Sequence, residues 1–120
     1  MRRIETVRQL EKGLHMSADK LLNEVTQATI SYAKAVDHEM ALEDARIGVK
    51  MAAVNRIMTA GDNPLTGKPH SFSSAEALVN TDREYAEYLS TIRAAVSARI
   101  VARGNYETAI LAAQLAANQK

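Results

Sequence analysis

The stretch ADKLLNEVTQATISYAKAVDHEMALEDARIGVKMAAVNRIMTA, residues 18–60, decides the fold of this 120-residue chain. It contains no proline, and Gly48 is its only weak helix former, so we expect one uninterrupted helix from Ala18 to Ala60. Ser17 is a suitable N-cap, and Asp19 in the first turn complements the helix dipole. At 1.5 Å per residue the helix is about 64 Å long, which exceeds the roughly 35 Å diameter of a compact globule of this chain length.

A second long helix is predicted from residue 82 to about residue 118. The TDRE sequence at residues 81–84 has the pattern of a capping box, and no proline follows it. A similar box, SSAE at residues 73–76, opens a short helix that reaches Val79. Two helix starts only eight residues apart imply a bend near Asn80.

Two further elements complete the predicted layout. Ile4, Val7 and Leu10 are spaced three apart and are followed by Gly13, which indicates a short N-terminal helix. The connection GDNPLTGKPHS, residues 61–71, contains both prolines of the chain, and residues 64–67 have the composition of a tight turn.

The two long helices should pack as an antiparallel hairpin, because a short connection favours packing of neighbouring elements. Facing residues then have numbers that add up to about 140. Apolar residues of the first long helix alternate at threes and fours, as in a coiled-coil seam; they are Leu22, Val25, Thr29, Tyr32, Val36, Met40, Ile47, Met51, Val54 and Met58. On the second helix the corresponding residues are Tyr85, Tyr88, Leu89, Ile92, Val96, Ile100, Tyr106, Ile110 and Ala113. We expect an all-α fold in a single helical domain, residues 1–120.

The predicted core of one copy is small. The apolar content of 47% comes largely from alanine, with one Phe, four Tyr and no Trp, so each buried position contributes little area. A lone pair of helices also leaves much of each apolar stripe in water. We therefore expect a self-associating hairpin, a homo-oligomer whose subunits complete one another's core.

Composition argues against several classes of protein. The chain has no cysteine, which excludes disulfides and thiolate metal sites within it. No apolar run approaches the roughly 18 residues that span a bilayer, and the first residues lack the apolar core of a signal peptide. We expect a cytoplasmic protein that does not enter membranes.

No catalytic or cofactor motif is complete. Gly67-Lys68 departs from a phosphate-binding loop because Pro69 occupies the Ser/Thr position and a helix precedes it. His38-Glu39 lacks the second histidine of a zinc-protease motif, since residue 42 is Leu42. With three histidines and no serine next to a plausible base, nucleophilic catalysis lacks its parts. We expect no enzyme activity, no metal site and no cofactor.

Charged residues form two groups of interest. Arg99 and Arg103 lie on the second long helix, at positions that the predicted register places opposite Glu39 and Glu43, so we expect ion pairs that fix register. Around the turn, a basic tip comprises Arg46, Lys50, Arg56 and Lys68, with His70 beside it. Between residues 45 and 72 the only acid is Asp62. This tip either binds an anionic partner or caps the negative end of the first long helix.

The segments SADKLLNEVTQATISYAKAV (17–36) and SFSSAEALVNTDREYAEYLSTIRAAVSARI (71–100) resemble the UvsY-type recombination mediators of bacteriophages in layout. The resemblance implies a ring-forming all-α protein that binds single-stranded DNA without sequence preference and helps to load a recombinase. It assigns DNA binding to the basic tip. The alternative from the residues is a small phage or bacterial interaction protein, a scaffold or an inhibitor, whose helical faces bind another protein.

Overall fold

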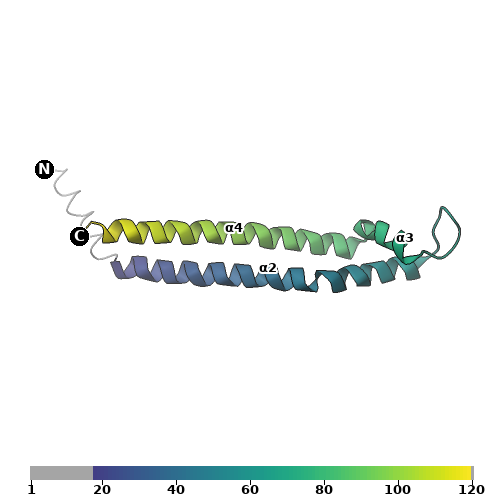
Figure 1. Cartoon of the computed structure of the whole chain (residues 1–120), viewed down its shortest axis with the longest axis horizontal. Helices are drawn as coiled ribbons and strands as arrows, with labels where there is room; N and C mark the ends of the chain where they lie inside the picture. The colour runs from purple at the N-terminus through teal and green to yellow at the C-terminus, as the bar shows by residue number, and fades with distance from the viewer. Residues whose placement is uncertain (1–17, 120) are drawn as a thin grey trace. The chain divides into compact units, whose positions relative to one another are not determined.

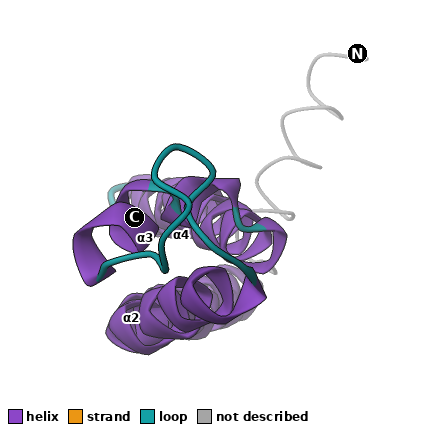
Figure 2. Ribbon diagram, turned by 90° about the vertical axis from the view of Figure 1, so that its right-hand side faces the viewer, coloured by secondary structure: helices purple, strands orange, loops and turns teal. Residues whose placement is uncertain are grey.

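The computed structural model describes residues 18–119, which form helices joined by loops (Figures 1 and 2). The elements are α2 (Ala18–Ala60), α3 (Phe72–Ala77), the 3-10 helix η1 (Val79–Thr81) and α4 (Arg83–Ala117). Within these residues, β structure is limited to an isolated bridge between Asp62 and Pro69. The all-α prediction is confirmed. The predicted N-terminal helix and the Ser17 cap lie outside the described residues.

α2 has the bounds that the sequence predicts, and α4 differs from its predicted bounds by one residue at each end. α2 runs from Ala18 to Ala60 over 43 residues, and α4 spans 35 residues from Arg83 to Ala117. Gly48 does not interrupt α2, because one glycine costs only about 1 kcal/mol in a helix interior. Absence of proline therefore decided both lengths.

Both predicted capping boxes are displaced by one or two residues. Ser71, not Ser73, is the N-cap of α3, and its extended backbone lets its hydroxyl accept a 3.2 Å hydrogen bond from the Ser74 N–H. At α4 the Tyr85 N–H donates to Asp82 Oδ2 at 2.9 Å, so the cap is Asp82. The Thr81 hydroxyl instead donates to the Leu78 carbonyl within η1. The predicted bend near Asn80 is this 3-10 turn.

The chain divides into two compact units, and each contains a segment of both long helices. Unit 1 comprises residues 1–36 and 98–120, and its described part pairs the start of α2 with the end of α4. There the rings of Tyr32 and Tyr106 lie 5.7 Å apart between centroids. This contact is antiparallel and close to the predicted register. The single domain predicted for residues 1–120 stays a prediction.

Unit 2, residues 37–97, contains every buried hydrophobic residue among the residues that the structure describes. Its main cluster draws on α2, α3, η1 and α4: Ala53, Val54, Ala75, Val79 and Tyr85. The Tyr88 hydroxyl donates a hydrogen bond to the Leu42 carbonyl, which joins α4 to α2. Antiparallel packing of a hairpin is thus present within each unit (Figure 1).

Part of the predicted α2 seam does not face α4. Met40, Ile47, Met51 and Met58 have exposed fractions of 58%, 75%, 46% and 39%. At about 100° per residue, these four side chains lie within about 40° of one another on the helix, whereas Ala53 lies about 140° from Met40. The inward face of α2 is instead built around Ala53 and Val54, with Val49 and Ile57 packed beside them. Ala53 and Tyr85 of α4 belong to the same buried cluster, where a small side chain occupies little space.

The connection between α2 and α3 is a compact turn. The Asn63 carbonyl accepts hydrogen bonds from the N–H groups of Thr66 and Gly67, at 3.2 and 2.8 Å. The Asn63 side-chain oxygen accepts a third, from the Leu65 N–H at 3.0 Å. Gly67 adopts φ +66°, a conformation that favours glycine. The predicted tight turn is confirmed.

Replacing Gly67 with alanine should destabilise the protein by about 1 kcal/mol, because an L-residue is strained at positive φ. Gly104→Ala is the matched control. Both positions have open space around an added Cβ, but Gly104 is in α4, where alanine should stabilise by up to about 1 kcal/mol. Urea denaturation measures the difference. Equal effects of the two substitutions would contradict the role of the turn.

Candidate interaction site

The five residues of the predicted DNA-binding tip all lie in unit 2 but do not form one free basic patch. Arg46, Lys50 and Arg56 belong to α2, whereas Lys68 and His70 belong to the connection after it. The three α2 cations each have an acidic partner. The five residues therefore have different environments.

Arg56 makes the strongest ion pair of unit 2. Its Nη2 lies 2.7 Å from Asp82 Oδ2 and its Nε lies 3.0 Å from Asp82 Oδ1, a two-pronged geometry. Its Nη1 lies 3.1 Å from Glu84 Oε2. The Asp82 side chain is only 12% exposed and also caps α4. Arg56 thus connects α2 to the first turn of α4.

The hydrogen bonds of Asp82, Arg56 and Arg46 shift the pKa values of these side chains. The pKa of Asp82 is lowered, first by the hydrogen bond from Arg56 and then by the Tyr85 N–H. The pKa of Arg56 is raised by the same contact with Asp82. The pKa of Arg46 is raised mainly by its hydrogen bond with the Tyr85 side chain. These groups are held in their charged forms.

Lys50 and Arg46 are also compensated. Lys50 Nζ lies 3.3 Å from Glu76 Oε1 of α3, and Arg46 Nη1 lies 3.7 Å from Glu43 Oε2 one turn earlier on α2. The sequence-based count over residues 45–72 treated these cations as unpaired, which was wrong. Their acids lie outside that stretch, and the turn brings α3 and the start of α4 alongside α2.

His70 is a structural residue. Its side chain is buried, and its Nδ1 shares a 2.8 Å hydrogen bond with the Ser74 hydroxyl. The Asn63 side-chain amide donates to the same hydroxyl at 3.2 Å. These contacts join the turn to α3, so His70 is not a surface ligand. Lys68 is the one tip cation that is exposed and has no ion pair within residues 18–119.

The expectation that no serine lies next to a base was wrong, because His70 and Ser74 are in contact. The pair nevertheless lacks the third group that would orient a catalytic histidine, since no carboxylate within residues 18–119 bonds to His70. The hydroxyl is already engaged by Asn63. The network stabilises the turn.

The predicted pairs between the long helices have a mixed outcome. Glu43 pairs with Arg46, and Arg103 Nε lies 3.0 Å from Glu107 Oε1, so both form contacts within their own helix. Acids and bases three or four residues apart are already neighbours on a helix surface. Glu39 belongs to unit 2 and Arg99 to unit 1, and their mutual pairing stays a prediction.

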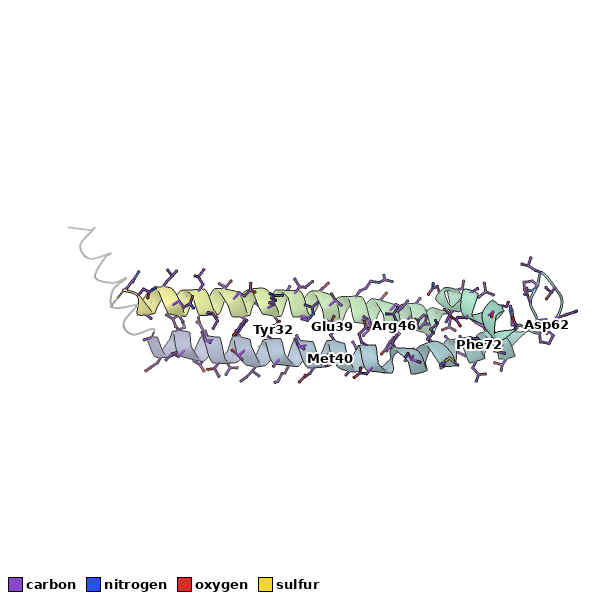
Figure 3. The ribbon with its side chains drawn as sticks, viewed as in Figure 1. Tyr32, Glu39, Met40, Arg46, Asp62 and Phe72 are labelled. Carbon is purple, nitrogen blue, oxygen red and sulfur yellow. The ribbon has the colours of Figure 1, made fainter. Side chains whose placement is uncertain are left out.

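Four residues that the sequence places in the seam against α4 form an exposed apolar surface on unit 2 instead. We define the α2 stripe as Met40, Ile47, Met51 and Met58, all at least 39% exposed. An open groove continues it, and its lining is Met51, Ala52, Val54, Asn55, Met58 and Phe72. Figure 3 marks Met40 on α2 and Phe72 at the start of α3. On a projection of α2 at 100° per residue the stripe borders the inward face, because Val54, which is only 2% exposed, lies about 40° from Met40.

Comparisons with family models, with curated proteins and with solved structures find no match to this chain. Within residues 18–119, no helix combines the length and the apolar composition that a bilayer crossing requires. In the same part of the chain, no three His, Asp or Glu side chains gather closely enough to hold a metal ion. The resemblance to UvsY-type mediators stays a prediction.

Asp82 should make stability depend on pH in the acid range. Because the pKa of Asp82 in the folded chain lies below its ordinary value of 3.8, the stabilisation by the carboxylate is present above that value. This contribution is lost as the pH falls through the lower, folded pKa. Asp82→Asn removes the charge but keeps a capping side chain, so its stability should fall less between pH 5 and pH 2, as measured by urea denaturation.

Two further variants separate the cap from the ion pair. Asp82→Ala removes both and should be about 1 kcal/mol less stable than Asp82→Asn. Asp62→Asn, at an exposed position of the turn, should change stability by less than about 0.5 kcal/mol. An identical acid profile in Asp82→Asn and the unsubstituted protein would refute the assignment.

Proposed function

We propose that this protein is a helical interaction module that self-associates and acts as a scaffold or an inhibitor through its exposed apolar helix faces. The observation that carries the proposal is the α2 stripe, in which four large apolar side chains occupy one face of one helix. From Met40 to Met58 this face extends for about 27 Å at 1.5 Å per residue. Single exposed apolar residues are ordinary, but a contiguous row is typical of an interaction surface.

The energetic gain from covering this surface is substantial. Fully burying one Met or Ile side chain contributes about 1.5–3 kcal/mol. The four residues of the α2 stripe are partly covered already, and Ile47, at 75% exposure, has the most to gain. Their combined burial would contribute on the order of several kcal/mol, which is enough to support association of two helices.

Unit 1 also exposes large apolar side chains. Among its described residues none is fully buried, although α2 and α4 each contribute apolar side chains there. Large exposed ones are Leu22, Ile30, Ile100, Val101, Leu111 and Leu115. A helical partner would give these residues the core that the described part of unit 1 does not form.

Protein binding is favoured over nucleic-acid binding by the ion pairs of the basic tip. Binding to single strands depends on cations that are free to neutralise phosphates. Arg46, Lys50 and Arg56 already have acidic partners, which leaves Lys68. Engagement of DNA by Lys50 or Arg56 would compete with ion pairs that join α2 to α3 and to the start of α4.

Light scattering and fluorescence anisotropy test this proposal together. At micromolar concentration we expect light scattering to give a multiple of 13.1 kDa. In the anisotropy experiment we expect no salt-sensitive binding of labelled single-stranded DNA between 50 and 200 mM salt. Salt-sensitive binding that Lys68→Ala reduces, without a change in helicity, would support the mediator prediction instead. A monomeric mass would refute self-association.

A further inference from the structure

We propose that the α2 stripe is the contact surface of a two-fold dimer, in which α2 of one copy lies antiparallel to α2 of a second copy. Ile47 then faces Met51 of the second copy, and Met40 faces its Met58. The inference rests on the proposed function, because it names the partner that covers this face. It goes further in specifying the orientation and the register.

The spacing of the α2 stripe is self-complementary. Ile47 and Met51 lie two residues on either side of Val49, and Met40 and Met58 lie nine residues on either side. In a two-fold interface, residue i of one copy contacts j of the other and j contacts i. In an antiparallel pair centred at position 49, each of the four side chains therefore faces a stripe residue of the second copy. Binding of an unrelated helix would not require the stripe residues to be spaced symmetrically about position 49.

Charge next to the stripe selects the antiparallel orientation. Asp44 lies about 40° from Met40 around the helix, is exposed, and has no ion pair within residues 18–119. Parallel pairing in register would bring Asp44 against Asp44 of the second copy, which is unfavourable. Antiparallel pairing places it opposite Val54 and Asn55. The Asn55 amide, in the groove lining, can donate a hydrogen bond to that carboxylate.

Gly48 is explained by the same arrangement. A Cβ at Gly48 would meet nothing within 4 Å, so no contact within the chain requires glycine at this helical position. Glycine costs about 1 kcal/mol relative to alanine in a helix interior. Position 48 is level with the proposed two-fold axis and lies about 80° from Met40 around the helix, at the edge of the α2 stripe. A missing side chain there leaves room beside the interface.

The methionines suit the groove that receives them. Met40 of the second copy would reach the groove between Met51, Met58 and Phe72, where Phe72 is 47% exposed. Methionine is unbranched and flexible, and its sulfur makes favourable contacts with aromatic rings. The groove therefore gains an apolar occupant of matching chemistry from the other copy.

Engineered cysteines test the orientation directly, because the chain has none of its own. Antiparallel pairing separates the two Met58 positions by about 27 Å along the helices. Met58→Cys alone should therefore give no disulfide-linked dimer under mild oxidation. An equal mixture of Met40→Cys and Met58→Cys should give the mixed disulfide as its main cross-linked product. A Met58→Cys homodimer would indicate parallel pairing and overturn the inference.

Ile47→Asp tests the surface itself. It places a charge beside the proposed axis in both copies and should weaken dimerisation at least 10-fold by analytical ultracentrifugation. Leu65→Asp, at a 93% exposed position in the turn, is the matched control and should leave dimerisation unchanged. Circular dichroism checks that both variants stay helical, as expected because Ile47 is largely exposed.

The outcomes separate this inference from the proposed function. If the unsubstituted protein is an oligomer but Ile47→Asp leaves its mass unchanged, the α2 stripe is not the interface and the inference fails alone. If the unsubstituted protein is a monomer, both fail. Loss of the dimer in Ile47→Asp together with the mixed disulfide supports the antiparallel pair.

Discussion

A single constraint governs this molecule: α2 carries apolar side chains on two faces, but residues 18–119 supply packing helices for only one of them. The inward face of α2 packs small residues such as Ala53 against Tyr85 of α4 and Val79 of η1. The other face presents Met40, Ile47, Met51 and Met58 to solvent. Hydrophobic burial is the dominant stabilising contribution to folding. A helix with an uncovered apolar face is therefore suited to bind another helix.

Asp82 shows how closely helix capping and tertiary packing are combined here. The same carboxylate accepts the Tyr85 N–H at the start of α4 and the Arg56 guanidinium from the end of α2. Because Asp82 is mostly buried, removing one of its partners would leave a poorly solvated charge. The start of α4 is thereby fixed relative to α2 within unit 2. Asp82, which has the sequence pattern of an ordinary helix cap, therefore also joins α2 to α4.

Helix lengths could be predicted from the sequence, but the faces of the helices could not. The bounds of α2 follow from the absence of proline between residues 18 and 60, which is a local property. Which face of α2 turns inward depends on the tyrosines of α4, and a spacing of threes and fours fits either face. The start of α4 was misplaced by one residue because Thr81 and Asp82 are both good caps, and Arg56 favours Asp82.

The environments of the candidate site residues could not be predicted from the sequence either, because they depend on tertiary contacts. Arg46, Lys50 and Arg56 look like a basic cluster when counted along the chain, but Lys50 and Arg56 meet acids that are 26 residues further on. The burial of His70 likewise depends on the way the turn packs on α3. The four residues of the α2 stripe belonged to the predicted seam, but their exposure depends on which residues of α2 pack inward, and this is again set by tertiary contacts.

The unequal distribution of the core has a dynamic consequence. All fully buried residues among residues 18–119 belong to unit 2, whereas the tyrosine pair is the aromatic contact of unit 1. Local opening requires little free energy where few apolar contacts must be broken. Backbone amides of residues 18–36 and 98–117 should therefore exchange with deuterium sooner than those around Ala53 and Tyr85. In isolation, the chain would open from the two outer helix ends and keep the region around the turn closed longest.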